Sequence, residues 1–288
     1  RSPARHTCTR CWPGRARPGP GGEGCALVRR AGTAQIRRPL IAAGTQMDSV
    51  WVALGCFIFL GFTLEAITGF GGTVIALALG ALLLPIPVLV PILVPLSLAM
   101  GVALVWRHWG HIDRPLLARL VLPAMLTGTA VGYLARNVLD ATLLRQAFGI
   151  LIVWCAAHTL WQRFAGGGAG QRPLWRTKAI TLSAGVTHGL FASGGPLLVY
   201  ALSGVALDKA RFRMTLITVW LVLDGALFAA FVFDGQMKTA ALPALAYLPV
   251  VVAGAVLGEW LHHRVSEQHF QLLTSALLLT TGAVLALR

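Results

Sequence analysis

The stretch VLVPILVPLSLAMGVALVW, residues Val88–Trp106, decides the class of protein to which this chain belongs. It contains no charged side chain over its whole length. A helix needs about 20 consecutive, mostly apolar residues to cross a hydrocarbon core about 30 Å thick. The stretch therefore predicts a membrane-spanning helix.

Similar apolar runs lie on both sides of Val88–Trp106. The further candidate segments are Val50–Phe70, Thr73–Leu84, Leu116–Ala135, Leu143–Trp161, Ala179–Ala192, Leu197–Ser203, Phe212–Phe233, Ala241–Leu261 and Leu272–Leu287. Several are too short to cross a bilayer alone, and these adjoin Gly-Gly pairs. The predicted fold is an all-α, polytopic integral membrane protein with helices that are broken or re-entrant at the Gly-Gly pairs.

The composition excludes the main alternatives to a helical membrane protein. Of 288 residues, 56% are hydrophobic and 12% are charged, and the mean hydropathy is +0.73. Soluble domains carry about 25% charged residues, which excludes a soluble monomer. Intrinsically disordered chains have low hydrophobicity, so the high apolar content excludes a disordered protein. A membrane β-barrel requires segments of about ten residues that alternate in polarity, whereas these runs are continuously apolar.

The net charge of +14 is concentrated at the N-terminus. Arg1–Gln46 holds nine arginines and Glu23, a balance of +8, and residues 47–288 carry the remaining +6. The segment has no apolar period, so we expect a disordered basic extension. Because no Met precedes Met47, one interpretation places the extension outside the natural product. No apolar stretch before Met47 has the length of a signal-peptide core, about 7–15 residues.

Neither the basic extension nor the cysteines predict a soluble partner or a metal. Nucleic-acid binding requires a basic folded face with readout elements, which the extension lacks. Cys8 and Cys11, with His6 nearby, supply only half of a four-ligand zinc site. Cys56 and Cys155 lie in apolar runs and are interpreted as packing residues. We expect no metal, no cofactor and no nucleic-acid partner.

Two sets of markers predict an internal duplication. Gly71-Gly72 and Gly194-Gly195 are 123 residues apart, and Pro123-x4-Gly128-x3-Gly132 recurs as Pro249-x4-Gly254-x3-Gly258 at an offset of 126. The two Gly pairs are expected to lie near each other in the membrane interior. The predicted organisation is an extension at 1–46 and a membrane domain at 47–288, with repeat one at 48–163, a hinge at 164–173 and repeat two at 174–287.

The positive charges predict the orientation of the repeats. Two basic clusters are expected in the cytoplasm, Arg163, Arg172, Arg176 and Lys178 in the hinge and Lys209, Arg211 and Arg213 in a later loop. Only Lys178–Ser203 separates them, so either this stretch forms a re-entrant pair of half-helices or one of the two clusters is placed wrongly. The repeats then have inverted topology, as in many secondary transporters. Arg136 and Arg145, at an external loop, count against this orientation.

The Gly pairs lie in Thr68-Gly69-Phe70-Gly71-Gly72-Thr73 and Phe191-Ala192-Ser193-Gly194-Gly195-Pro196. Glycine lets a helix break and lets backbone N–H groups approach a ligand. A half-helix that starts after the break presents about half a positive charge to an anion, and Pro196 suits its first turn. The alternative is tight helix packing through small residues. Two breaks at matching positions favour the anion site.

The same residues resemble a known family. Gly61-Phe62 with Thr68–Gly72, the string Gly189–Leu197, and Lys209 with Phe212-Arg213 are similar to the paired signatures of the sulfite exporter TauE/SafE family. The resemblance covers Met47–Leu287, with Thr73 and Ala192 at positions where the family often has glycine. It implies a multi-pass bacterial inner-membrane permease for small sulfur-containing or carboxylate anions, which is not an enzyme.

Four ionisable residues lie inside or beside apolar segments. Burying a carboxylate at the membrane centre costs at least about 2.5–3.5 kcal/mol, so Glu65 is expected to face a cavity. His188 is interpreted as a proton relay or anion donor, or as a buried neutral histidine. Asp224 is expected to pair with an Arg or His across the bundle. For Glu259 the favoured interpretation is a solvated charge at the membrane interface.

Other interpretations stay open at this point. Arg211 and Arg213 could attract anions, although an orienting role in the cytoplasm is favoured. Ser193 with His158 or His188 could indicate an intramembrane serine hydrolase, but a rhomboid-type Gly-x-Ser-Gly would need glycine at Phe191. A membrane scaffold protein is the third class. Paired helix breaks and acids within the membrane favour a transporter.

The sequence therefore predicts a specific site for a small anion. The proposed substrate-binding residues are Thr68, Gly69, Gly71, Gly72, Ser193, Gly194, Gly195 and Pro196. The proposed proton-coupling residues are Glu65, His188 and Asp224, because a negative charge on Glu65 and a bound anion disfavour each other. The expected partners are the anion and the lipid bilayer, and a homo-oligomer is compatible with the sequence.

Overall fold

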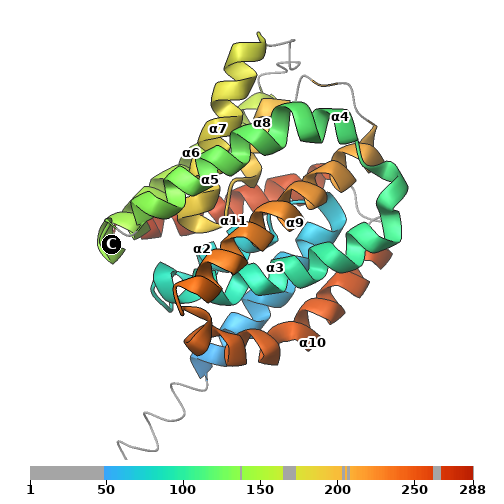
Figure 1. The fold of residues 1–288 in the computed structure, drawn as a ribbon. Coiled ribbons are helices and arrows are strands. Elements are labelled where there is room, and N and C mark those ends of the chain that lie inside the picture. The colour runs from blue at the N-terminus through green and yellow to red at the C-terminus, as the bar shows by residue number, and fades with distance from the viewer. Residues whose placement is uncertain are drawn as a thin grey trace, which may run out of the picture. The chain divides into compact units, whose positions relative to one another are not determined.

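A computed structural model describes residues 49–136, 138–164, 173–202, 205, 208–261 and 267–287. These residues form helices and contain no β-strand, which confirms the predicted all-α fold (Figure 1). Val50–Arg288 forms one compact unit. The predicted extension and most of the predicted hinge lie outside the described residues.

The helices follow the predicted apolar segments closely. Ser49–Thr68 is the first helix. The elements after it are α2 Gly72–Gly80, α3 Ile86–His108, η1 Trp109–His111, α4 Arg114–Leu116, η2 Leu117–Val121, α5 Leu122–Arg136, α6 Ala141–Phe164, α7 Leu174–Phe191, α8 Gly195–Leu202, α9 Lys209–Phe233, α10 Met237–Leu261 and α11 Glu267–Leu287.

Among the described residues, six helices are long and apolar enough to cross a membrane. They are Ser49–Thr68, Ile86–His111, Arg114–Arg136, Ala141–His158, Ala210–Phe233 and Met237–Leu261. By contrast, α2 has nine residues and α8 has eight. At about 1.5 Å per residue, neither can cross a hydrocarbon core of about 30 Å.

Both short helices begin directly after a short non-helical segment, which is called a break below. The first break lies between Thr68 and Gly72, where Gly69 and Gly71 have φ angles of 86° and 98°. Glycine adopts this left-handed region without the steric penalty that a Cβ atom brings. The second break consists of residues 192–194, between α7 and α8, and there Ala192 has a φ of 51°. Among the residues that the structure describes, Ala192 is the non-glycine residue with positive φ, and it lies at the second break.

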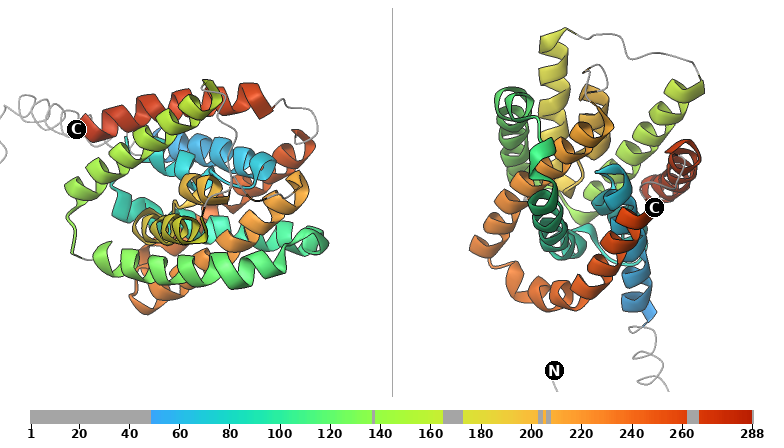
Figure 2. Two further views of the ribbon diagram at one scale, coloured as in Figure 1. Left: turned by 90° about the horizontal axis from the view of Figure 1, so that it is seen from above. Right: turned by 90° about the vertical axis from the view of Figure 1, so that its right-hand side faces the viewer.

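The two short helices lie inside the helical bundle (Figure 2). All nine residues of α2 are buried, and α8 buries five of its eight. The long helix α3 packs against α9 and α10, and α2 packs against α3. This packing places the start of each short helix within the protein rather than at its surface.

Glycines let the surrounding helices cross at close range. In α5, a Cβ atom at Gly128 or Gly132 would overlap a backbone carbonyl of α7. In α10, a Cβ atom at Gly258 would lie 2.5 Å from the Thr63 carbonyl of the first helix. The predicted Gly-x3-Gly motifs therefore pack against the two helices that precede the breaks.

These crossings join the two halves of the chain to each other. The α5 glycines, from the first half, contact α7 of the second half, and the α10 glycines contact the first helix. Likewise α6 packs on α11, where a Cβ atom at Gly282 would lie 3.0 Å from the Gly149 carbonyl. Such packing of helices from one half against helices from the other is expected for a duplicated chain. The duplication and its orientation in the membrane stay predictions.

Replacing Gly132 with Ala should destabilise the protein. The new methyl group would overlap the Val186 carbonyl and lie 3.1 Å from Gly189 Cα, so α5 and α7 must separate. Overpacking of this kind costs about 1–3 kcal/mol. Thermal unfolding in detergent should show a lower midpoint. Gly110→Ala is the control, because no atom lies within 4 Å of a Cβ there. Equal midpoints for the two variants would contradict the close crossing.

Candidate functional site

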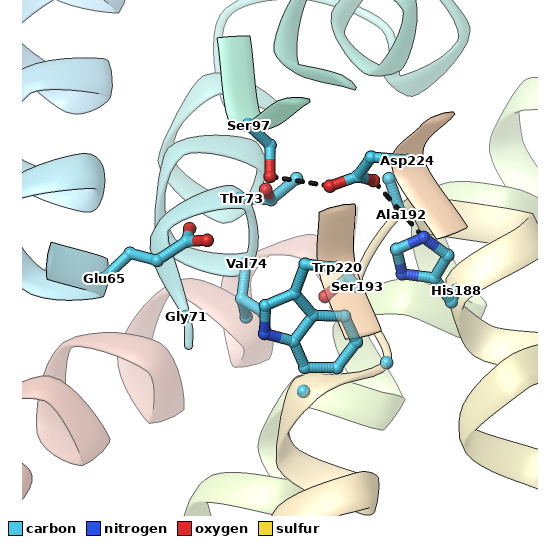
Figure 3. Close-up of a pocket in the computed structure, with 12 residues that line it drawn as sticks. Glu65, Gly71, Thr73, Val74, Ser97, His188, Ala192, Ser193, Trp220 and Asp224 are labelled. Carbon is cyan, nitrogen blue, oxygen red and sulfur yellow. Dashed lines mark hydrogen bonds and ion pairs between the residues drawn. The ribbon is translucent and has the colours of Figure 1, made fainter. Parts of the chain in front are cut away.

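A polar pocket lies between the two helix breaks (Figure 3). Its cavity volume is about 20 Å³, which is enough space for about one water molecule. Its lining residues come from the first helix, α2, α3, α7, α8, α9 and the second break, and they are Glu65, Gly71, Thr73, Val74, Ser97, His188, Ala192, Ser193, Gly194, Gly195, Trp220 and Asp224. None of the twelve is Lys or Arg, so an anion here would have to be bound by amides, hydroxyls and protonated groups.

Glu65 reaches from the first helix to the start of α2. Its side chain is only 4% exposed, and its carboxylate lies against the start of α2, so closely that a Cβ atom at Gly72 would overlap Oε2, which places it beside the backbone N–H donors of Gly72 and Thr73. These two groups, called the α2 amides below, belong to the first turn of α2 and have no partner within that helix. The start of α2 thus already holds an anionic group from the protein itself.

Gly72 is required by this arrangement. An ideal Cβ atom at Gly72 would overlap Glu65 Oε2 and would lie 3.0 Å from the Gly61 carbonyl. The Gly71 position is different, because a Cβ atom there would meet nothing within 4 Å. Gly71 is needed for its positive φ, whereas Gly72 is needed for the space that Glu65 occupies.

Asp224 forms the centre of a buried polar group on the opposite side of the pocket (Figure 3). Ser97 Oγ donates to Asp224 Oδ2 at 2.6 Å, and His188 Nε2 lies 3.3 Å from Asp224 Oδ1. The His188–Asp224 distance suits an ion pair, although the angles do not meet hydrogen-bond criteria. The predicted pairing of Asp224 across the bundle is therefore present, with His188 as the partner.

Trp220 connects this polar group to the first break. Its ring stacks on His188 with centroids 5.7 Å apart and planes inclined by 20°. Its indole Nε1–H donates to the Gly69 carbonyl at 3.1 Å. Trp220 therefore fixes both the imidazole plane and the backbone of the break.

Three buried polar atoms in the pocket make no hydrogen bond within the described residues: His188 Nε2 and Asp224 Oδ1, which face each other as an ion pair, and His188 Nδ1, which faces no partner. His188 is 1% exposed, and within the described part of the chain its Nδ1 makes no hydrogen bond. Figure 3 shows this ring nitrogen turned away from Asp224, toward the side of the second break. Leaving a buried polar group unsatisfied costs about 1–3 kcal/mol, which a bound ligand would recover.

The second break lies close to His188. A Cβ atom at Gly194 would overlap the Ala184 carbonyl and would lie 3.1 Å from His188 Cβ. At Gly195, by contrast, a Cβ atom would meet Phe70 Cδ2 at 3.4 Å, an ordinary contact. The start of α8 therefore has room beside Gly195 for a small group.

The structure brings most of the predicted site residues to this one pocket. Those that line it are Glu65, Gly71, His188, Ser193, Gly194, Gly195 and Asp224. Four others lie outside the lining: Thr68, Gly69, Gly72 and Pro196. The Thr68 hydroxyl lies 2.9 Å from the Leu64 carbonyl and 2.8 Å from the Phe70 carbonyl, so it stabilises the break itself. Pro196 faces a separate apolar pocket.

Sequence reasoning did not identify Thr73, Val74, Ser97, Ala192 and Trp220 as lining residues. Ser97 is a polar residue in the middle of the apolar stretch Val88–Trp106, a signal that could have been used. Trp220 lies in mid-segment, unlike tryptophans that anchor helices at the membrane interface. Both contact their partners across more than a hundred residues, which local spacing does not reveal.

Two charged residues outside the pocket form an ion pair that the sequence did not reveal. Arg213 is 7% exposed and pairs with Glu259, and its side chain packs against Gly69. The Glu259 side chain is 31% exposed, so this acid is both paired and partly solvated. The orienting role of Arg213 stays a prediction. Arg211, in contrast, is exposed and pairs with Asp208.

Replacing Ser97 with Ala should loosen the polar group around Asp224. The variant removes a buried hydrogen bond to a carboxylate, and such bonds contribute about 1.5–3 kcal/mol. We expect a lower thermal midpoint and slower transport. Ser183→Ala in α7 is the matched control, since Ser183 is exposed and donates only to the Ala179 carbonyl of its own helix. If both variants behave alike, the Ser97–Asp224 bond is not important.

The chain was compared with known proteins. A family profile described as "Sulfite exporter TauE/SafE" matches residues 53–285. The "Probable inner membrane transporter protein TsaS" of Comamonas testosteroni is 27% identical over 164 residues, which is 56% of this chain and 68% of that protein. No solved structure matches.

Proposed function

Because the chain belongs to the sulfite exporter TauE/SafE family, whose members are membrane transporters rather than enzymes, we propose that it is a multi-pass inner-membrane permease for a small anion. The proposed substrates are sulfite, sulfonates and related sulfur-containing or carboxylate anions. The family description names sulfite, and the similar protein from Comamonas testosteroni is named as a probable inner-membrane transporter.

The observation that carries the proposal is the pocket between two helix breaks. Each break ends in the start of a short helix, where backbone N–H groups have no partner within the helix. Such groups bind anions without forming an ion pair, which favours release on the far side. Many secondary transporters bind their substrates at broken helices near the bilayer midplane.

Proton coupling follows from the charges around the pocket. Glu65 and Asp224 are both buried, and each carboxylate acts on the other through space. A third negative charge would be strongly disfavoured there unless a proton entered with it. We therefore propose that the anion moves together with one or more protons, carried by Glu65 or by the His188–Asp224 pair.

The hydrolase alternative has less support from the geometry. A catalytic histidine must be within hydrogen-bond reach of its serine. Among the described residues His188 Nδ1 has no hydrogen-bond partner, and its other nitrogen faces Asp224 rather than Ser193. Together with the transporter family, this favours transport over hydrolysis.

Proteoliposomes with the purified protein test the proposal. Counterflow of labelled sulfite should be measured against an excess of unlabelled sulfite, thiosulfate, methanesulfonate, sulfate or acetate inside the vesicles. We expect uptake well above protein-free liposomes for at least one sulfur oxyanion, and faster uptake when the trans side is alkaline. Uptake equal to that of protein-free liposomes for every anion would contradict the proposal.

A further inference from the structure

The start of α2 differs from the start of α8 in the side chain that faces it. The Glu65 side chain extends from the first helix toward α2 (Figure 3), and its carboxylate lies beside the α2 amides. Counting 123 residues onward, the offset that separates Gly71 from Gly194, gives His188 as the residue that matches Glu65. One break therefore faces a carboxylate, and the other faces an imidazole with an unpartnered nitrogen.

We propose that Glu65 is an internal competitor of the transported anion: its carboxylate occupies the α2 amides, and the substrate gains these donors only when the carboxylate leaves. The inference rests on the proposed function, because it concerns how the same pocket fills. In the structure the Glu65 carboxylate occupies the α2 side of the pocket. The substrate is therefore expected to bind first on the other side, beside Gly195 and His188.

The chemistry of the two groups makes them alternatives. A carboxylate and a sulfonate or sulfite group are both oxyanions that accept charge-assisted hydrogen bonds from backbone N–H groups. The α2 amides are one small set of donors, so both anions cannot use them at once. The overlap that a Cβ atom at Gly72 would make with Glu65 Oε2 shows how closely the carboxylate sits on this backbone.

Protonation of Glu65 would release the amides, because a neutral carboxyl group accepts hydrogen bonds more weakly. The other charged groups around Glu65 must therefore be considered. Across the pocket are Asp224 of α9, which acts on Glu65 through space, and His188 of α7. On α10, which packs against the first helix, Glu259 is neutralised by its ion pair with Arg213. Asp224 and His188 are thus the groups that can alter the response of Glu65 to pH.

Binding of methanesulfonate to the full chain in detergent, measured by titration calorimetry, tests the inference. This anion keeps its charge between about pH 5.5 and about pH 8, a range in which carboxylates and histidines of the protein can change theirs. Affinity of the wild type should fall as the pH rises. Removing a competing charged hydrogen bond in Glu65→Ala should raise affinity at the higher pH by about ten-fold or more and flatten the pH dependence.

One variant distinguishes occupation of the amides from charge repulsion. Glu65→Asp keeps the charge but shortens the side chain by one methylene, so that it no longer reaches the α2 amides. It should bind methanesulfonate more tightly than the wild type at the higher pH. Asp208→Asn is the control, because it neutralises an exposed acid and keeps the cap of α9.

The outcomes separate the two proposals. If Glu65→Ala binds tightly but Glu65→Asp matches the wild type, repulsion alone acts and the inference is overturned. If Glu65→Ala also matches the wild type, the inference is wrong and the proposed function stands. If no form binds methanesulfonate, sulfite or thiosulfate at any pH, the proposed function fails, and the inference fails with it.

Discussion

Replacing Glu65 with Gln should abolish anion accumulation driven by a pH gradient while sparing anion binding. Gln resembles the protonated carboxyl group in size and polarity, but it cannot exchange a proton. The amide is neutral, so it neither repels an anion nor competes strongly for the α2 amides. In proteoliposomes, downhill exchange should continue, and accumulation should fall to the level of vesicles without a gradient.

Asp208→Asn should accumulate the anion as the wild type does, because Asp208 is an exposed acid far from the pocket lining. The coupling role of Glu65 would be contradicted if Glu65→Gln kept the full pH dependence of transport. Asp224 and His188, which face each other at 3.3 Å, would then be the next residues to test.

Replacing Gly195 with Leu should eliminate anion binding without unfolding the protein. A Cβ atom at Gly195 makes only ordinary contacts with Phe70 and Trp220, so the backbone accepts a methyl group, and a longer side chain has to extend past these rings. The larger isobutyl group then fills the space beside the start of α8 and prevents close approach of an anion to the backbone amides. Binding of sulfite or methanesulfonate should fall by about a hundred-fold or more, as expected when several charge-assisted hydrogen bonds are lost.

Gly195→Ala is the matched control, since its methyl group fits at 3.4 Å from Phe70 Cδ2. It should retain most of the binding. The thermal midpoints of the two variants separate lost binding from lost folding. Normal binding by Gly195→Leu would mean that the second break is a packing feature, as the alternative interpretation of the Gly-Gly pairs holds.

The fold was largely predictable because its signal is local. The stretch Val88–Trp106 lies within α3, Ile86–His108. A long uncharged segment in a membrane has to form its backbone hydrogen bonds internally, and an α-helix does this. The first break contains Gly69 and Gly71, whose positive φ angles suit glycine, whereas at the second break the residue with positive φ is Ala192, which the sequence did not indicate.

The site was predictable only in part, because its contacts join distant segments. The sequence indicated Glu65, His188 and Asp224 as buried ionisable residues but not the partners Ser97 and Trp220. Nor could spacing reveal that Thr68 would use its hydroxyl within the break. Spacing also did not reveal the ion pair between Arg213 and Glu259, which joins α9 to α10.

The central claim is that the transported anion binds in the pocket between the two helix breaks. Its most direct test is counterflow of labelled sulfite in proteoliposomes that contain the wild type, Gly195→Ala or Gly195→Leu at equal protein density. Counterflow in the wild type and in Gly195→Ala, with none in Gly195→Leu, is the predicted result. Counterflow at the wild-type rate in Gly195→Leu would contradict the claim, because the anion would then cross the protein without using this pocket.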